Sequence, residues 1–204
     1  LWIRWCKPCA QYHRGPPPKQ AELNPFPASS PFEVLSIDIT GPHPKSRDGN
    51  EYILTAVDIF SKWAEAMPIR QHTAVIVAKK LVDNVFSKFG VPLRILSDQG
   101  PEFESALMAE LCRTHGIEKI RTTSYKPSTN GTCERFHRTL NSMLGKVVSE
   151  SQHDWDRNVG PVMAAYRDTV HRAPGYTPNM LVLGRERRAP IDLVLAVGDD
   201  EPAG

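Results

Sequence analysis

The sequence has few cysteines, no long hydrophobic run and little net charge. Four cysteines occur in 204 residues, and Cys112 and Cys133 each stand alone, which argues against a disulfide scaffold and favours a reducing compartment. No apolar stretch approaches the length of a membrane span, and no signal peptide is evident. The chain opens at Leu1 without a methionine, so we expect it to be part of a longer protein.

The charge balance is +2 at pH 7, so overall charge alone does not indicate a nucleic-acid-binding protein. The charges are nevertheless spread unevenly. Between Arg121 and Arg188 there are eleven Lys or Arg residues against six Asp or Glu, whereas residues 191–204 hold four acids and no Lys or Arg. A basic last third with an acidic tail fits a surface that faces a polyanion, although moderately basic surfaces are common.

Composition divides the chain into four parts. Residues 1–14 contain a C-x-x-C pair, and residues 15–33 are rich in proline, which predicts an extended linker. Residues 34–190 carry the apolar runs of a folded domain, and residues 191–204 form the acidic tail. With 40% hydrophobic residues, the chain has enough apolar material for one substantial core.

The domain is expected to be α/β, with three strands first and then alternating helices and strands. We predict strands at 34–40, 51–60, 62–69, 94–98 and 117–123, helices at 73–90, 104–116, 132–150 and 154–172, and a polar loop at 124–131. This order implies a mixed sheet with helices packed on it.

Three acids stand in unusual places. Asp38 lies inside an apolar strand, where an unpaired carboxylate is costly. Asp98 follows a strand, at the end where α/β sheets bind ligands. Glu134 opens a helix whose neighbouring charges are basic. Because crowded carboxylates repel one another unless divalent cations lie among them, the three acids favour metal-dependent phosphoryl transfer.

Each acid also has an ordinary structural role open to it. Asp38 would serve as an acceptor for backbone amides, Asp98 as the start of an Asx-turn and Glu134 as a plain surface acid. Asp58 and Glu102 compete for the metal role, because spacing alone does not exclude them.

Several blocks occur in an order that is typical of one family. They are "WCKPCAQY", "LSIDITGP", "YILTAVDIFSKWAEAMPI", "GVPLRILSDQGPEF", "SYKPSTNGTCERFHRTLNSML" and "WDRNVGPVMAAYRDTVHRAPGYTPNMLVLGR". The chain resembles the catalytic core of retroviral and LTR-retrotransposon integrases, most closely the gypsy type, and 35 residues separate Asp98 from Glu134. The resemblance implies a ribonuclease H-like fold with a mixed five-stranded sheet flanked by helices.

By this resemblance, Asp38, Asp98 and Glu134 form a catalytic DDE triad that binds two Mg²⁺ or Mn²⁺ ions. The implied enzyme is a polynucleotidyl transferase: water trims the 3′ ends of the element DNA, and the freed 3′-hydroxyls then attack target DNA. No protein nucleophile is required. An alternative from another class is a host-captured integrase remnant that acts only as a DNA-binding or dimerisation module.

The same resemblance places DNA contacts around Glu134. The residues implicated are Tyr125, Lys126, Asn130, Gly131, Arg138 and Asn141. Lys126 stands where relatives usually carry His, and Asn141 stands where they carry a basic residue, which would weaken a phosphate contact. The structural alternatives are a tight turn at Asn130-Gly131 and a salt bridge between Glu134 and Arg138.

Cys6 and Cys9 look like the second half of the family's His-His-Cys-Cys zinc module. Zinc takes four ligands, so this site is incomplete here even with His13, and Zn²⁺ is expected only in the full-length parent. The resemblance further implies element and target DNA as partners, a homo-oligomer of at least two copies, a host chromatin factor, no membrane, and a nuclear location after cytoplasmic element particles.

Overall fold

The computed structural model describes residues 28–121, 127–149 and 151–188. Within the second range, only the backbone of residues 127–130 is described. Within the described residues five strands form one sheet in the order β3-β2-β1-β4-β5. The strands are β1 (Val34–Thr40), β2 (Tyr52–Asp58), β3 (Ala64–Ile69), β4 (Arg94–Ser97) and β5 (Glu118–Arg121). The β1–β2 and β2–β3 pairs are antiparallel, whereas β1–β4 and β4–β5 are parallel. The predicted mixed sheet is therefore confirmed.

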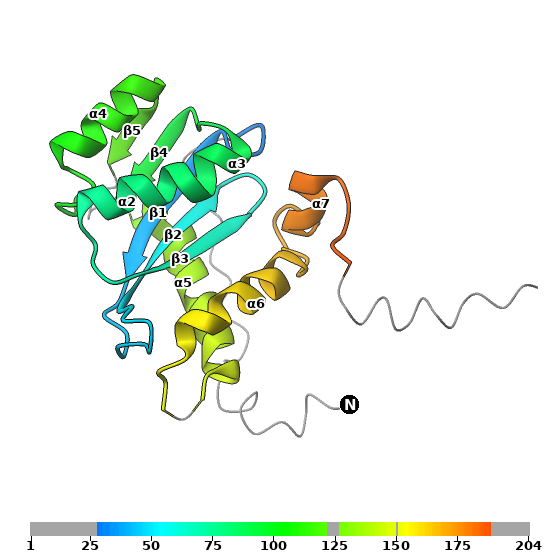
Figure 1. Cartoon of the computed structure of the whole chain (residues 1–204). Coiled ribbons are helices and arrows are strands. Elements are labelled where there is room, and N and C mark those ends of the chain that lie inside the picture. Colours follow the sequence, from blue (N-terminus) through cyan, green and yellow to red (C-terminus); the bar gives the residue numbers. More distant parts are fainter. Residues whose placement is uncertain (1–27, 122–126, 150, 189–204) are drawn as a thin grey trace, which may run out of the picture.

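Helices cover both faces of the sheet (Figure 1). One face carries α2 (Ala74–Leu81), the π-helical η2 (Val82–Phe86), α3 (Ser87–Phe89) and α4 (Ala106–His115). The other carries α5 (Pro127–Val147) and α6 (Trp155–Arg167), and the short α7 (Pro178–Leu183) follows. No helix in the described part of the chain is both long and apolar enough to cross a bilayer.

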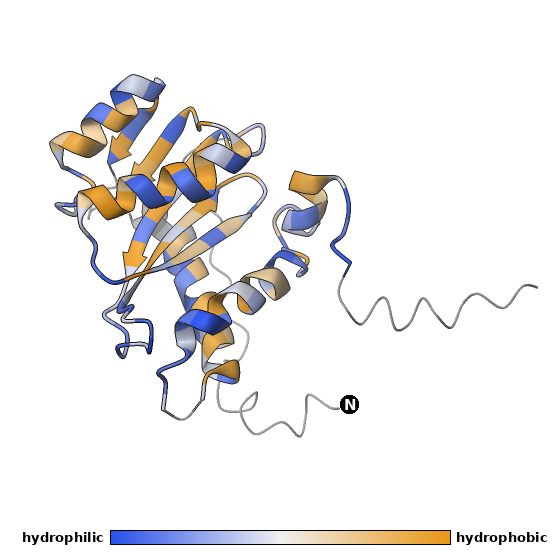
Figure 2. Ribbon diagram, in the orientation of Figure 1, coloured by the Kyte–Doolittle hydropathy of each residue, from blue (hydrophilic) through white to orange (hydrophobic). Residues whose placement is uncertain are grey.

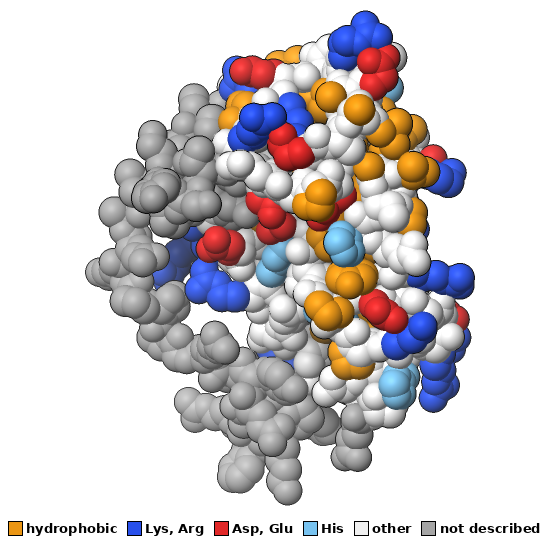
Figure 3. Space-filling model, turned by 90° about the vertical axis from the view of Figure 1, so that its left-hand side faces the viewer, with side chains coloured by type: hydrophobic (Ala, Val, Ile, Leu, Met, Phe, Trp, Pro, Cys, Tyr) orange, Lys and Arg blue, Asp and Glu red, His pale blue; other side chains and the backbone are white. Residues whose placement is uncertain are grey.

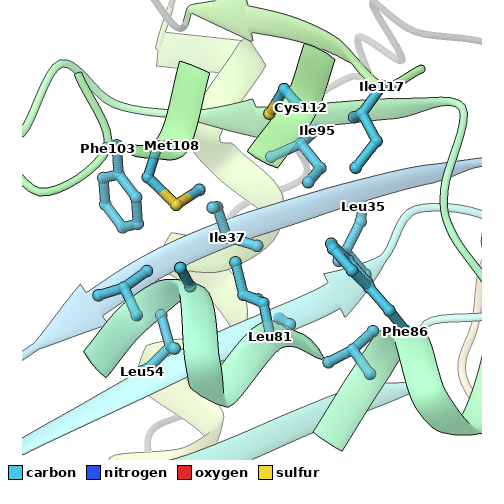
Figure 4. Packing of buried hydrophobic residues seen from close by; sticks show 14 of the residues in the cluster. Leu35, Ile37, Leu54, Leu81, Phe86, Ile95, Phe103, Met108, Cys112 and Ile117 are labelled. Atoms are coloured by element: carbon cyan, nitrogen blue, oxygen red, sulfur yellow. The ribbon is translucent and has the colours of Figure 1, made fainter. Parts of the chain in front are cut away.

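The alternation of side chains along the strands builds a separate core on each face. Leu35 and Ile37 of β1 and Leu54 of β2 pack against α2 and α4 (Figure 4), while Ile53 and Val57 of β2 face α5 and α6. Successive residues of a strand point to opposite faces, so the central strands carry apolar side chains on both sides, interrupted by polar residues (Figure 2). Asp38, one residue after Ile37, consequently lies on the α5 face.

The helix ends follow their local sequence. The hydroxyls of Thr73, Ser105 and Thr177 accept backbone N–H groups at the starts of α2, α4 and α7, which satisfies donors that lack partners within the helix. Gly116 ends α4 in the left-handed conformation with φ of 68°, which glycine adopts at little cost.

Two boundaries of the predicted elements were wrong. Helix α5 begins at Pro127, so Pro127–Gly131 belongs to the helix and not to the loop predicted at 124–131; proline suits the first turn, where its missing N–H costs nothing. Helix α6 ends at Arg167, five residues before the predicted end, and α7 was not expected. Trp63 and Trp155 are both buried in the core.

Candidate active site

Asp38 and Asp98 lie side by side at one end of the sheet. In the parallel β1–β4 pair, Ser36 is opposite Leu96; Asp38 follows two residues later within β1, and Asp98 comes directly after the last residue of β4, Ser97. Both acids act electrostatically on Cys133 of α5, so both lie toward the side that this helix covers. The sequence placed these two acids on separate strands, and the register of the fold brings them together.

Local backbone hydrogen bonds hold the two carboxylates. Oδ1 of Asp38 accepts the Ile39 N–H at 2.8 Å, and Oδ1 of Asp98 accepts the Gly100 N–H at 3.0 Å. The Asx-turn considered for Asp98 therefore forms. A Cβ on Gly100 would lie only 3.2 Å from Asp98 Oδ1 and 3.0 Å from Glu102 Oε1, so glycine leaves the space that these two acids occupy.

Helix α5 brings Glu134 to the flank of this pair. Cys133, Phe136 and Leu140 are the buried residues of this part of the helix, and Cys133 Sγ donates to Ser36 Oγ at 3.1 Å, two residues before Asp38. Since successive helical residues turn by about 100°, Glu134 points away from the strand surface and is exposed.

Both Asp38 and Asp98 affect the pKa of the Cys133 thiol. Burial raises the pKa of Cys133 to about 12, and the negative charges of Asp38 and Asp98 add to that rise. Side-chain hydrogen bonds with Ser36 and Thr55 lower this pKa and so act in the opposite direction. Both carboxylates therefore lie near the first inward-facing residue beside Glu134, and the thiol stays protonated at neutral pH.

The carboxylates of Asp38, Asp98 and Glu134 do not converge on one position where they could share a metal ion. Among the described residues, no three His, Cys, Asp or Glu side chains lie close enough together to hold a metal ion. Asp38 and Asp98 both lie near Cys133, and Glu134 is the next residue of α5, exposed on the helix surface. The three carboxylates are all oxygen donors, the ligand type that Mg²⁺ and Mn²⁺ prefer.

The competing acid Asp58 belongs to the opposite end of the sheet. It pairs with Leu35, at the start of β1, and is fully buried. Its carboxylate accepts the N–H groups of Phe32 at 3.0 Å and Ser61 at 2.8 Å, and the Ser61 hydroxyl at 2.5 Å. Burial raises the pKa of Asp58 despite these bonds. Asp58 is thus a structural acid.

The second competitor, Glu102, does lie near the pair. Its carboxylate is next to Gly100, on the turn that Asp98 begins, and Oε2 is 3.6 Å from Nδ1 of His72. On the face seen in Figure 3, acidic and histidine side chains gather near the middle, with Lys and Arg toward the edges. Glu102 therefore links the Asp98 turn to the β3–α2 loop that carries His72.

Sequence reasoning missed a role for His137. Its Nε2 lies 2.8 Å from Thr55 Oγ1, and its Nδ1 lies 3.8 Å from Asp38 Oδ2. The available signal was its position three residues after Glu134, on the same helical stripe as the buried Cys133 and Leu140, where a polar residue needs a partner.

The expected DNA-contact residues are only partly described. Arg138 and Asn141 are exposed one and two turns after Glu134, and no ion pair joins Glu134 to Arg138 among the contacts of the described residues. Gly131 lies in α5 and is buried. The side chain of Asn130 falls outside the described part, as do Tyr125, Lys126, Cys6, Cys9 and His13.

A basic surface hollow of about 690 Å³ lies at the same end of the sheet as Asp38. The β1–β2 and β3–α2 loops form it, and its lining residues are Lys45, Arg47, Asp48, Gly49, Glu51, Tyr52, Arg70, Gln71, His72 and Thr73. Lys45 lies 3.5 Å from Glu51, and Arg157 lies 3.2 Å from Asp48.

The remaining two cations of the hollow, Arg47 and Arg70, form no ion pair within the part of the chain that is described. Arg70 donates its Nε–H to the Asp48 carbonyl at 3.1 Å. The hollow therefore has surplus positive charge at the end of the sheet that carries Asp38.

Residues 28–127 match the family model described as "Integrase core domain". This chain carries an integrase core domain. The Pol polyprotein of Feline endogenous virus ECE1 is 37% identical over 88% of this chain and 17% of its own length. The retrovirus-related Pol polyprotein from transposon 412 of Drosophila melanogaster is 32% identical over 78% of this chain and 13% of its own length. The chain thus spans a small part of the polyproteins that it resembles.

The integrase core also has the fold of solved integrases. The HTLV-2 integrase catalytic core domain, in complex with magnesium in its trimeric form, aligns with a TM-score of 0.62 at 20% identity, over 76% of this chain and 99% of that one. At this identity the likeness concerns the fold alone. The fold is therefore ribonuclease H-like, as the sequence blocks implied.

Proposed function

We propose that this integrase core catalyses 3′-end processing and strand transfer of element DNA into target DNA. The observation that carries the proposal is that Asp38, within β1, and Asp98, directly after the parallel strand β4, both act electrostatically on buried Cys133 of α5, the residue before exposed Glu134. Sequence similarity to Pol polyproteins over most of this chain supports the same assignment.

Asp38, Asp98 and Glu134 would together hold Mg²⁺ or Mn²⁺. When bound, two such ions activate an attacking oxygen and stabilise a leaving one in phosphoryl transfer. The protein's part is to fix one carboxylate on strand β1 and a second on the turn that directly follows β4, and to supply the third acid from α5. A magnesium-bound relative supports the choice of ion.

Two surfaces would hold the DNA. Exposed Arg138 and Asn141 continue the flank of Glu134 along α5, and Tyr125, Lys126, Asn130 and Gly131 precede it in the chain. The basic hollow around Arg47 and Arg70 offers a second place for backbone phosphates. Joining two DNA ends requires at least a dimer, and the HTLV-2 catalytic core is known in a dimeric and a trimeric form.

The setting of the reaction follows from its substrates. Insertion into host DNA places the active protein in the nucleus, with chromatin and a host factor as the partners that direct it. In the longer parent protein, Cys6 and Cys9 would supply two of four Zn²⁺ ligands.

A disintegration assay tests the proposal, because it asks only the core to reverse strand transfer. A branched DNA substrate with Mn²⁺ is given to the wild type, to Asp98→Asn and to Asp83→Asn, an exposed acid of η2 paired with Lys79. We expect the wild type and Asp83→Asn to resolve the branch and Asp98→Asn to fail. If the folded wild type also fails, the chain is a non-catalytic DNA-binding or dimerisation module.

A further inference from the structure

Two hydrogen bonds connect helix α5 to the backbone of Asp38. His137 lies one turn after Glu134, with Nε2 at 2.8 Å from the Thr55 hydroxyl. Thr55 is the cross-strand partner of Asp38 in the β1–β2 pair, and its hydroxyl donates to the Asp38 carbonyl at 3.1 Å. The helix that carries one acid is therefore tied directly to the residue that carries another.

The donor and acceptor roles in this chain of bonds follow from the tautomer of His137. A threonine hydroxyl has one proton, so with that proton on the Asp38 carbonyl the hydroxyl oxygen accepts from Nε2–H of His137.

The other ring nitrogen then faces the carboxylate. Nδ1 of this ring is 3.8 Å from Asp38 Oδ2, beyond hydrogen-bond distance. The side chains of His137 and Asp38 are only 15% and 16% exposed, so water competes weakly with these interactions.

We propose that His137 is a positioning residue that, through Thr55, sets the place of α5 and Glu134 relative to Asp38 and thereby the affinity of the acids for divalent cations. The inference rests on the proposed function, because it takes the three acids to be metal ligands. Removing a hydrogen-bonding support of metal ligands typically weakens metal binding by about 10–100-fold.

Mn²⁺ affinity provides a test that does not depend on turnover. Electron paramagnetic resonance of free Mn²⁺ gives the dissociation constant for the wild type, Thr55→Val, His137→Ala and their double variant, with thermal melts to show folding. We expect each single change to weaken binding by about 10-fold, and the double variant to be no weaker than the worse single one, because both changes break the same link.

Two further variants sharpen the test. His137→Gln retains an N–H donor for Thr55 and is expected to restore most of the affinity. Thr139→Ala removes an exposed hydroxyl that bonds the Arg135 carbonyl on the same helix, and we expect it to leave the affinity unchanged. Losses that add in the double variant, or unchanged affinity in folded Thr55→Val, would overturn the inference.

The outcomes separate this inference from the proposed function. If the wild type binds no Mn²⁺, both fail together; if it binds Mn²⁺ and the folded variants bind equally well, only the inference fails. If His137→Ala does not fold, nitrogen-15 NMR of the wild-type histidines decides the matter. A proton on Nε2 with a bare Nδ1 is expected, and the reverse tautomer contradicts the hydrogen-bond chain.

Discussion

The two ends of the β1–β2 pair carry acids of opposite kinds. At one end, Asp58 is completely buried and its oxygens accept three protein donors. At the other end, Asp38 is partly exposed, and Asp98 follows the end of the parallel strand β4 on the same side of the sheet. An acid whose lone pairs are filled by the protein stabilises the fold, whereas two neighbouring acids repel each other until a cation joins them. Whether an acid is structural or available to bind a cation therefore depends on how deeply its carboxylate is buried and on how many protein donors it accepts, and not on its being in a strand.

The largest effect is expected at the end of the β1–β2 pair that carries Asp38 and is proposed to bind metal, here called the ligand end, when it loses a charge. Asp38→Asn should lower the disintegration rate with Mn²⁺ by about 10³-fold, since several kcal/mol of metal-assisted stabilisation is lost. Its free energy of unfolding should stay the same or rise slightly, because repulsion with Asp98 disappears. Rates and urea denaturation of the same preparations measure both. A large loss of stability would mean that Asp38 serves the fold, like Asp58.

The reverse pattern is expected at the structural end. Asp58→Ala should lower the free energy of unfolding by about 2–4 kcal/mol, because the donors of Phe32 and Ser61 become buried without partners. Disintegration per folded molecule should be unchanged. Asp83→Ala, at an exposed acid, is the matched control and should cost less than about 0.5 kcal/mol. A folded Asp58→Ala protein without activity would contradict the division of roles.

The sequence could predict the fold further than it could predict the site. The runs around Val34, Tyr52 and Ala64 are apolar and bounded by turn residues, so the strand order followed from local chemistry. Asp38 and Asp58 have nearly the same local surroundings, an acid after apolar residues in a strand, so only the pairing register tells them apart. Register depends on contacts between distant segments, which a local pattern does not contain.

The same limit applies to the helix and the hollow. The start of α5 at Pro127 was missed because polar loop residues and a first helical turn share proline, serine and asparagine. The link from His137 to Thr55 spans 82 positions, and the hollow joins two loops that are about 20 residues apart. Such sites become visible only when the chain is folded.

The pH dependence of the free energy of unfolding also distinguishes the two ends of the β1–β2 pair. Its expected change is smaller than the effects of the Asp38 and Asp58 substitutions. Burial lowers the pKa of His137 to about 4 and also lowers those of His43 and His171, so the unfolded chain binds protons before the folded one does as pH falls below 6.5. Stability should therefore fall by about 2 kcal/mol between pH 7 and pH 5. The raised pKa of Asp58 acts in the opposite direction.

Urea denaturation at pH 7, 6 and 5 measures this effect, and His137→Gln should flatten the curve. A flat wild-type curve would mean that the imidazole at the ligand end remains accessible to protons in the folded state. A flat curve for His137→Gln alone would assign the pH response to the ligand end and not to His43 or His171.

The smallest effect concerns the cations beside the ligand end. Arg70→Ala should weaken duplex DNA binding by about 3–10-fold and reduce the salt slope by about 1, if the hollow holds one phosphate through this guanidinium. Fluorescence anisotropy at several salt concentrations measures both. Arg94, at the opposite end of β4 and paired with Glu118 at 3.3 Å, gives the matched control Arg94→Ala. Equal losses in both variants would mean that DNA responds to net charge alone, and the hollow would then have no special part in binding.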